Sequence, residues 1–396
     1  MGFLEVINCL LYVIVFFIYW RKHKMVDAYF ILIAGFAFTS IISMAYQFSG
    51  ESTFLNTTLF PYLYLFVCIL ICLRPFKQLD IGNLSNISES PMIKVLTLIY
   101  IISGIFSIYY TIPKAVELFY ADQWDLIRQS LYEGEDMELY SSAFERLCKN
   151  IHSYLSPFGV IMCFFELTKK HKNRILIILL FGTWLLDSLL GATLVASRGI
   201  VVNVLLNFIL ILVIFKKAIS SKTKKLLVSF GGVLAIPTAI YLFIVSIARF
   251  GEGEASGSAF MYLGHAMQCF NCRVMGSMHD YAWGKYAFNY FFEDKSINMQ
   301  ALGNNANNAF YTVIGDFYID WGPVVTILLC LLLMAILSYF THKKQKSLSD
   351  LVVIVYFASF FMRGMFVYGR GYALQWIMLV VVWLIIRISE KRLIVK

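Results

Sequence analysis

Several arginines stand where apolar runs meet or end, and a guanidinium in that position could bind phosphate at a membrane surface. The group stays charged and offers two parallel hydrogen bonds to phosphate oxygens. Arg198 is the clearest case, because Ser197, Arg198 and Gly199 lie in a very short connection between two apolar runs. The alternative is an arginine that extends to the lipid headgroups. The residues in such positions are Arg198, Arg249, Arg363 and Arg370.

Arg363 lies within an apolar run, where a charge costs about 2.5–3.5 kcal/mol at mid-membrane and less near the surface. We expect Asp187, which lies in an apolar run of its own, to be its partner. An ion pair that only holds two helices together is one interpretation of this pair. The other is a basic outer vestibule for a polyanionic headgroup.

The polar interval 249–322 contains the candidate acid–base residues. His279 and Asp280 are adjacent, and such a pair could supply a general base near neutral pH. Arg273 precedes them and is a further candidate for phosphate binding. His265 lies in the same interval. For either histidine, a surface position without a catalytic role is the commoner outcome.

The same interval is rich in aromatic and amide side chains. Flat apolar rings with polar rims suit sugar rings, and side-chain amides hydrogen-bond hydroxyl groups both as donors and as acceptors. An aromatic belt at the membrane interface and a polar linker are the alternatives. The aromatics are Tyr281, Trp283, Tyr286, Phe288, Tyr290, Phe291 and Phe292, and the amides are Asn304, Asn305, Asn307 and Asn308. Trp283 and Asn308 are our substrate-binding candidates among them.

The composition indicates which elements position these groups. Of the 396 residues, 60% are hydrophobic and only 14% are charged, with a mean hydropathy of +0.73. Soluble domains are nearer half apolar and a quarter charged, and a membrane helix needs about 20 apolar residues. The chain is therefore predicted to be an all-α polytopic membrane protein, a single transmembrane domain over 1–396 with about eleven spans (ten to twelve). The spans are predicted at 3–20, 26–46, 55–73, 93–112, 151–168, 175–195, 200–215, 226–248, 318–340, 349–368 and 372–388.

The charge pattern predicts the topology. Lysines and arginines gather in alternate connections, as the positive-inside rule requires, which places the N-terminus outside and the C-terminus inside. The rule also accounts for the net charge of +9 without a nucleic-acid partner. Two external loops are predicted, 114–150 and 249–317. The run 3–20 lacks a basic leader and a cleavage site, so we expect a first span there and not a signal peptide.

No cofactor is expected from the motifs. The short cytoplasmic connections contain no glycine-rich phosphate loop and no paired-carboxylate metal motif, which argues against a nucleotide or a metal. Cys269 and Cys272 could form a disulfide in an oxidising compartment or remain free thiols. No second ligand pair stands at a spacing that suits zinc. Any chemistry is therefore expected at the external face.

Two segments carry a resemblance to a known family. The sequence Ala-Ser-Arg-Gly at 196–199 follows an apolar span and precedes the large external loop. The segment 308–322 has an aromatic run with Tyr311 and Thr312, then Asp316 and a glycine before the next helix. Together they resemble the O-antigen polymerase (oligosaccharide repeat unit polymerase) family over about 196–330. That family usually has an even number of spans with both ends inside, from which the eleven predicted here depart.

The resemblance implies a metal-independent glycosyltransferase of the bacterial inner membrane that works on the periplasmic face. It would move a growing glycan from undecaprenyl pyrophosphate to a hydroxyl of an incoming lipid-linked repeat unit, producing O-antigen, capsular or exopolysaccharide. Arg198 and Arg249 would stabilise charge on the pyrophosphate, and His279 or Asp280 would activate the acceptor hydroxyl. The substrate-binding candidates are Arg273, Arg363, Arg370, Trp283, Tyr311, Asn308 and Asp316. Expected partners are the lipid-linked oligosaccharide, membrane lipid and a chain-length regulator.

Three other functions remain open. An O-antigen ligase-type transferase would use the same donor with a different acceptor, which the sequence does not discriminate. A transporter or flippase of lipid-linked oligosaccharide would have charges along many spans and short loops on both sides, whereas the outer interval here is long. A membrane acyltransferase would place a histidine at the membrane boundary early in the chain. His23, in a basic cluster, fits that poorly.

Overall fold

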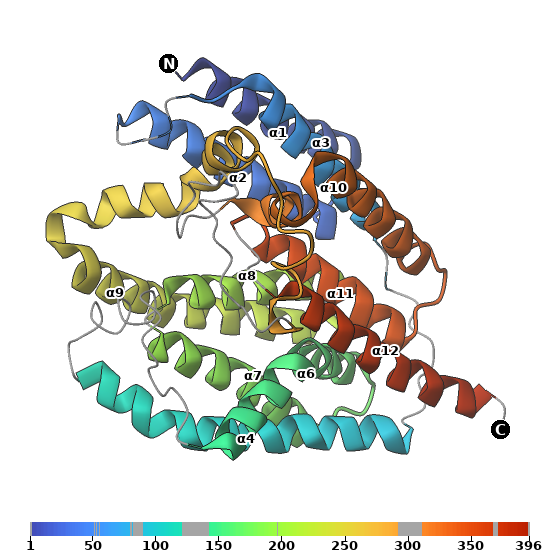
Figure 1. Cartoon of the computed structure of the whole chain (residues 1–396). Coiled ribbons are helices and arrows are strands. Elements are labelled where there is room, and N and C mark those ends of the chain that lie inside the picture. The colour runs from blue at the N-terminus through green and yellow to red at the C-terminus, as the bar shows by residue number, and fades with distance from the viewer. Residues whose placement is uncertain are drawn as a thin grey trace. The chain divides into compact units, whose positions relative to one another are not determined.

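The computed structural model describes residues 2–50, 52, 54, 56–79, 81, 90–120, 142–195, 197–291, 311–366 and 371–394. Within these residues the chain is built of helices and contains no strand (Figure 1). Each predicted span overlaps one of these helices, although several helix ends differ from the predicted bounds. The helices are α1 (Phe3–His23), α2 (Ala28–Phe48), α3 (Leu59–Leu73), α4 (Pro91–Tyr120), α6 (Ala143–Thr168), α7 (Arg174–Leu194), α8 (Arg198–Phe215), α9 (Ser221–Cys269), α10 (Thr312–Thr341), α11 (Leu348–Arg363) and α12 (Tyr372–Ile394).

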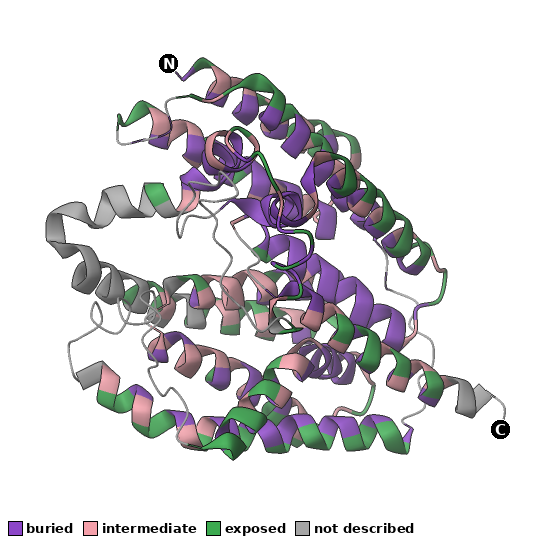
Figure 2. Cartoon of the chain, in the orientation of Figure 1, coloured by how far each residue is buried: buried purple, intermediate pink, exposed green. Residues whose placement is uncertain are grey.

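The lengths and apolar compositions of these helices fit a membrane protein. Eight of the described helices are long and apolar enough to cross a bilayer, and α8 contains a shorter apolar helix, Gly199–Phe215. Along α4, buried and exposed positions recur with the helical period (Figure 2). The exposed positions include Leu98, Ile102 and Ile105. A helix that exposes large aliphatic side chains in this way is suited to lipid contact.

Local side-chain chemistry explains where several helices begin. Asp27 caps α2, because its carboxylate accepts the backbone N–H of Phe30 at 2.8 Å. Ser142 and Asn173 cap α6 and α7 in the same way. Such caps satisfy backbone donors that have no partner within the helix, and each contributes about 1 kcal/mol.

The sequence predicts a single transmembrane domain over 1–396, whereas the contacts within the chain divide it into two compact units. Unit 1 contains Met1–Asp80, Ser256–Lys344 and Tyr356–Ile377, and unit 2 contains Ile81–Ala255, Gln345–Val355 and Met378–Lys396. In unit 1, α1 packs on α2 and α3 packs on α10. In unit 2, α4 packs on α6 and α7, and α7 packs on α8.

The two predicted external loops are more helical than expected. In the interval 249–317, α9 continues to Cys269 and is followed by the π-helix η2 (Phe270–Met275). In the interval 114–150, α4 continues to Tyr120 and α6 begins at Ala143. A helix is held by backbone hydrogen bonds and does not end where the apolar run ends. Residues 121–141 and 292–310 of these loops lie outside the described residues.

Candidate functional site

The helix α10 is broken at Gly322, and this break organises the candidate site. Gly322 has φ 69° and ψ −176°, a backbone conformation confined almost entirely to glycine. Pro323 follows it and disfavours a helical conformation in the residue before it. A Cβ atom on residue 322 would lie 2.7 Å from the ring of Tyr281. The break therefore requires glycine both for its backbone angles and for its close contact with that ring.

The break leaves backbone carbonyls available to another segment. Pro323 has no N–H, so the carbonyl of Ile319 lacks its usual donor within the helix. The N–H of Ala282 donates to the carbonyl oxygen of Ile319 at 2.8 Å, and the N–H of Trp283 donates to that of Asp320 at 2.9 Å. The segment 279–291, which we call the outer turn, is thus attached to α10 by backbone hydrogen bonds.

The side chain of Asp320 completes this attachment. Its Oδ1 accepts the N–H of Tyr286 at 2.9 Å, and its Oδ2 accepts the N–H of Ala287 at 2.7 Å and the hydroxyl of Tyr372 at 3.0 Å. Asp320 is fully buried. Hydrogen bonds to a charged acceptor are about twice as strong as neutral ones. The carboxylate therefore fixes both the outer turn and the start of α12.

A second buried carboxylate, Asp316, lies one helical turn before Asp320 on the same face of α10. The hydroxyl groups of Tyr286 and Tyr311 are 2.6 Å apart. Burial, together with the nearby charge and hydrogen bond of Asp316, raises the pKa of Tyr286 well above its ordinary value. Tyr286 therefore stays protonated and acts as a hydrogen-bond donor in this cluster.

Two residues at the site have left-handed backbone conformations that only glycine adopts without strain. Thr312, at the start of α10, has φ 68°, and Trp283 in the outer turn has φ 50°. The buried hydroxyl of Thr312 makes no hydrogen bond within the described residues. Its backbone N–H donates to the carbonyl of Phe366. Such residues each cost about 1–3 kcal/mol and cluster at functional sites.

The outer turn presents aromatic and titratable groups to its surroundings. The side chain of Trp283 is 65% exposed, and its ring makes an edge contact with that of Tyr281 at 6.0 Å. His279 and Asp280 are both exposed, and the Asp280 carboxylate accepts the N–H of Tyr281 at 2.8 Å. Lys285 is exposed as well. The turn thus combines a fixed aromatic surface with groups that can exchange protons.

The structure brings some of the predicted site residues together. His279, Asp280, Trp283, Tyr311 and Asp316 all lie in the outer turn or at the start of α10 in unit 1.

Arg273 and Arg363 also belong to unit 1. The guanidinium of Arg273 lies 4.8 Å from the centre of the Phe54 ring, and Arg363 is exposed at the end of α11. Arg198 begins α8 in unit 2. The remaining predictions concern parts that are not described: the side chains of Arg198 and Arg249, and the whole of Asn308 and Arg370.

The predicted partner of Asp187 is wrong. Asp187 accepts the hydroxyl of Ser107 at 2.6 Å and the ammonium of Lys149 at 2.8 Å, all within unit 2. Lys149 lies near the start of α6, outside the span predicted at 151–168, and hydropathy alone does not pair it with Asp187. The carboxylate is therefore accounted for without Arg363.

The structure also shows the environment of His265 and the state of Cys269 and Cys272, all in the interval 249–317. His265 is buried in α9, where its Nδ1 lies 2.5 Å from the carbonyl of Met261 and its ring stacks on Phe54. Cys269 and Cys272 are free thiols. Neither the histidine nor the cysteines belong to the exposed surface of the outer turn.

Sequence reasoning missed the positioning residues Asp320, Tyr286 and Tyr372. Tyr286 was counted only as one of a group of aromatics. The useful signal was the Gly322-Pro323 pair, which predicts a break in an otherwise continuous apolar helix. Such a break frees carbonyls that a neighbouring segment can use, and Asp320 lies directly before it.

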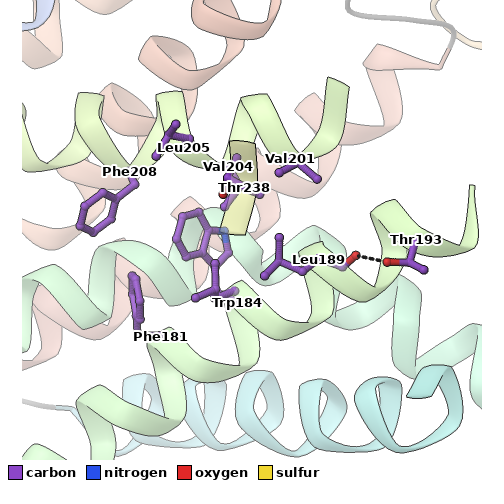
Figure 3. Close-up of a pocket in the computed structure, with 10 residues that line it drawn as sticks. Phe181, Trp184, Leu189, Thr193, Val201, Val204, Leu205, Phe208 and Thr238 are labelled. Carbon is purple, nitrogen blue, oxygen red and sulfur yellow. Dashed lines mark hydrogen bonds between the residues drawn. The ribbon is translucent and has the colours of Figure 1, made fainter. Parts of the chain in front are cut away.

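A separate apolar cavity of about 180 Å³ lies in unit 2 between α7, α8 and α9 (Figure 3). Phe181, Trp184, Val201 and Phe208 contribute to its wall. Its lining contains no charged side chain. The cavity offers apolar contacts and no acid–base chemistry.

Comparison of the chain with protein-family models, with curated protein sequences and with solved structures gives no match. The chemistry of the outer turn, and of the helix break that holds it, is therefore the basis on which a function can be inferred.

Proposed function

We propose that this protein is a membrane glycosyltransferase that lengthens oligosaccharides carried on a lipid pyrophosphate, and that the outer turn binds the sugar. The apolar helices support a location in a membrane. The long interval between α9 and α10 supports chemistry at one membrane surface. The predicted topology places that surface outside the cell.

One observation carries the proposal: an exposed tryptophan is held in a fixed and strained position. Trp283 is 65% exposed although its neighbours Ala282 and Tyr286 are buried. Its own N–H is bound to the carbonyl of Asp320. A tryptophan that serves only as a membrane anchor needs no such backbone attachment. A rigid ring with little conformational entropy to lose is suited to stacking on a sugar.

The reaction needs a base and a stabilised leaving group. An acceptor hydroxyl oxygen attacks the anomeric carbon of the donor sugar, and the bond from that carbon to the pyrophosphate oxygen breaks. The hydroxyl proton passes to His279 or Asp280, and the lipid pyrophosphate leaves with the bonding electron pair. Guanidinium groups stabilise the developing negative charge. Arg273, which belongs to the same unit as the outer turn, is the proposed residue for this role.

A transporter or flippase of lipid-linked oligosaccharide is a second candidate, because α10 is discontinuous. Broken helices with buried charges surround the substrate sites of many transporters, and Asp316 and Asp320 are buried at this break. We favour the transferase because the strained, exposed Trp283 and the exposed pair His279 and Asp280 belong to the same turn. A ligase-type transferase differs only in its acceptor.

The test uses the purified full-length protein in lipid nanodiscs with a synthetic lipid-pyrophosphate-linked repeat unit. Gel separation should show products that contain two or more repeat units. Trp283→Ala should reduce product formation at least tenfold, whereas Trp20→Ala, which changes an exposed tryptophan of α1, should not.

The other outcomes identify the alternatives. Product formed only with a different acceptor would indicate a ligase. Movement of intact substrate across vesicles, without product, would indicate a transporter and overturn the proposal. Equal activity of Trp283→Ala and the unaltered protein would remove the outer turn from the mechanism.

A further inference from the structure

The helix α1 contains a buried carboxylate, and only one of its two oxygens has hydrogen-bond partners within the described residues. Glu5 is 1% exposed. Its Oε1 accepts the hydroxyl of Thr57 at 2.8 Å and the hydroxyl of Tyr62 at 3.2 Å. Its Oε2 is buried and has no hydrogen-bond partner among the described residues. A buried charge in this state is costly unless another group compensates it.

Among the described residues, four more buried polar oxygens of α1 and α2 have no hydrogen-bond partner. Three lie toward the same ends of the two helices as Glu5: Asn8 Oδ1, Ser43 Oγ and Gln47 Oε1. The fourth, the hydroxyl of Tyr12, lies about two helical turns from Glu5. Asn8 lies three residues after Glu5 and Gln47 lies four after Ser43, so each pair shares one face of its helix. The four acceptors at these ends of the two packed helices are therefore left without donors within the described residues.

The packing of α1 on α2 brings these residues to the same end of the helix pair. The helices are joined by the short connection 24–27 and pack against each other in opposite directions. A Cβ atom on Gly2 would lie 3.0 Å from the ring of Phe48, so the start of α1 meets the end of α2. Counting inward from that contact, Glu5 is level with residue 45, midway between Ser43 and Gln47, and Asn8 is level with residue 42, next to Ser43.

No basic side chain of the described chain forms an ion pair with Glu5. The amide of Asn271 is used by the backbone N–H and carbonyl of Thr58, at 2.9 and 2.7 Å. The amide of Gln268 donates to the carbonyl of Ser43 at 2.8 Å. These neighbouring side chains are neutral, so they do not offset the charge of Glu5.

The Cys272 thiol, which is close enough to feel the charge of Glu5, is neutral as well. Burial is the main cause that raises its pKa to about 11, and the Glu5 carboxylate acts in the same direction. Cys272 therefore supplies no thiolate. Within the described residues no group of three or more His, Cys, Asp or Glu side chains could hold a metal ion. One carboxylate with neutral oxygens suits a hard cation of single charge better than a divalent ion, which usually takes more anionic ligands.

We propose that Glu5, Asn8, Ser43 and Gln47 bind one alkali-metal cation between α1 and α2. The ion neutralises the buried carboxylate and satisfies the amide and hydroxyl oxygens around it. It stabilises unit 1 and takes no part in the transfer reaction. The site is independent of the proposed function, because it depends only on these four side chains and their burial.

The experiment measures the thermal unfolding midpoint of the purified full-length protein in detergent, in NaCl, KCl or choline chloride at equal ionic strength. A bound ion stabilises the folded state in proportion to the logarithm of its concentration above the dissociation constant. We expect the midpoint to rise by several degrees with Na⁺ or K⁺ relative to choline. The more effective salt identifies the preferred ion. Saturable binding of radioactive ²²Na⁺, displaced by the preferred ion, measures occupancy directly.

Variants assign the effect to the site. Glu5→Gln should abolish the difference between the salts, and Asn8→Ala should weaken ion binding at least tenfold. Glu117→Gln makes the same chemical change at an exposed position of α4 and should respond like the unaltered protein. Asn8→Ala preserves the test if Glu5→Gln does not fold.

Two results would overturn the proposal. Equal midpoints of the unaltered protein in all three salts would show that no alkali-metal ion stabilises it. A Glu5→Gln variant that is more stable than the unaltered protein in every salt, without ion binding in either, would show that Glu5 is simply protonated.

Discussion

The carboxylate of Asp320 accepts the backbone N–H of Ala287 at 2.7 Å, and this contact joins a helix break to the segment that exposes Trp283. The same carboxylate also accepts the N–H of Tyr286. Asp320 is therefore a positioning residue: it is buried beneath the outer turn and does not belong to the exposed surface. Its loss should disturb the turn before it affects any bound group directly.

Asp320→Asn should lower the thermal unfolding midpoint and loosen the outer turn. An amide has one acceptor oxygen where the carboxylate has two, so a buried N–H or hydroxyl donor would face the new NH₂ group. A buried donor without an acceptor costs about 1–3 kcal/mol. The unfolding midpoint and the rate of proteolysis within 279–291 measure the effect. Asp280→Asn, at an exposed position, should change the midpoint little, and equal effects of both substitutions would contradict this role for Asp320.

Gly322→Ala should destabilise the protein for two separable reasons. The positive φ strains any residue with a Cβ atom, and that atom would lie 2.7 Å from the Tyr281 ring. Combining it with Tyr281→Ala relieves the contact and leaves the backbone strain, so the double variant should lose less free energy of unfolding than the sum of the single variants.

Gly182→Ala provides the matched control, because residue 182 lies within α7 and no atom lies within 4 Å of its added Cβ. This change should stabilise the protein by about 0.5–1 kcal/mol. The measurement is the free energy of unfolding of Gly322→Ala, Tyr281→Ala, the double variant and Gly182→Ala, from their thermal unfolding. Additive effects of Gly322→Ala and Tyr281→Ala would show that the close contact has no energetic role.

The helices could be predicted from the sequence because the membrane imposes length and composition on them. Each predicted span overlaps a helix from α1 to α12, and an apolar run is sufficient to locate it. The helix ends were less predictable. Pro113 lies inside α4 and Arg249 inside α9, although the hydropathy pattern predicts that a span ends at each of them. Backbone hydrogen bonding continues past the point at which hydropathy changes.

The candidate site was only partly predictable. The density of aromatics located the outer turn, but spacing alone does not distinguish the buried Tyr286 from the exposed Trp283. That difference arises from the attachment of the turn to Asp320, which lies more than thirty residues away in the chain. The local sequence pattern does not predict long-range contacts of this kind. The Gly322-Pro323 pair was the one local sign of them.

Arg198→Ala should abolish elongated product in the nanodisc assay if its guanidinium contacts the pyrophosphate, as the resemblance of the segment 196–199 implies. Arg198→Lys should fail as well if two parallel hydrogen bonds are needed, since an ammonium group does not provide that geometry. The matched control is Arg21→Ala, which removes an exposed arginine in the basic last turn of α1. Full activity of Arg198→Lys would mean that charge alone is sufficient, and full activity of Arg198→Ala would exclude the residue from catalysis.

The stability of the protein should fall in mild acid because of His265. Burial lowers the pKa of this imidazole below its ordinary value of 6.5, and the charge of Arg273 acts in the same direction, whereas the hydrogen bond with Met261 opposes it. In the unfolded chain the pKa returns to the ordinary value. As the pH falls through about 6.5, the unfolded state therefore binds a proton that the folded state does not, and the free energy of unfolding decreases.

The contribution of the neutral, buried His265 to the free energy of unfolding is complete above about pH 6.5. It is lost progressively as the pH falls toward the lowered pKa of the folded state. Comparing unfolding midpoints at about pH 7.5 and 5.5 measures it. His265→Phe should show a smaller drop than the unaltered protein, because phenylalanine keeps the stacking on Phe54 and has no proton to bind. His171→Phe changes an exposed histidine and should leave the drop unchanged. An equal drop in His265→Phe would assign the acid sensitivity to other groups.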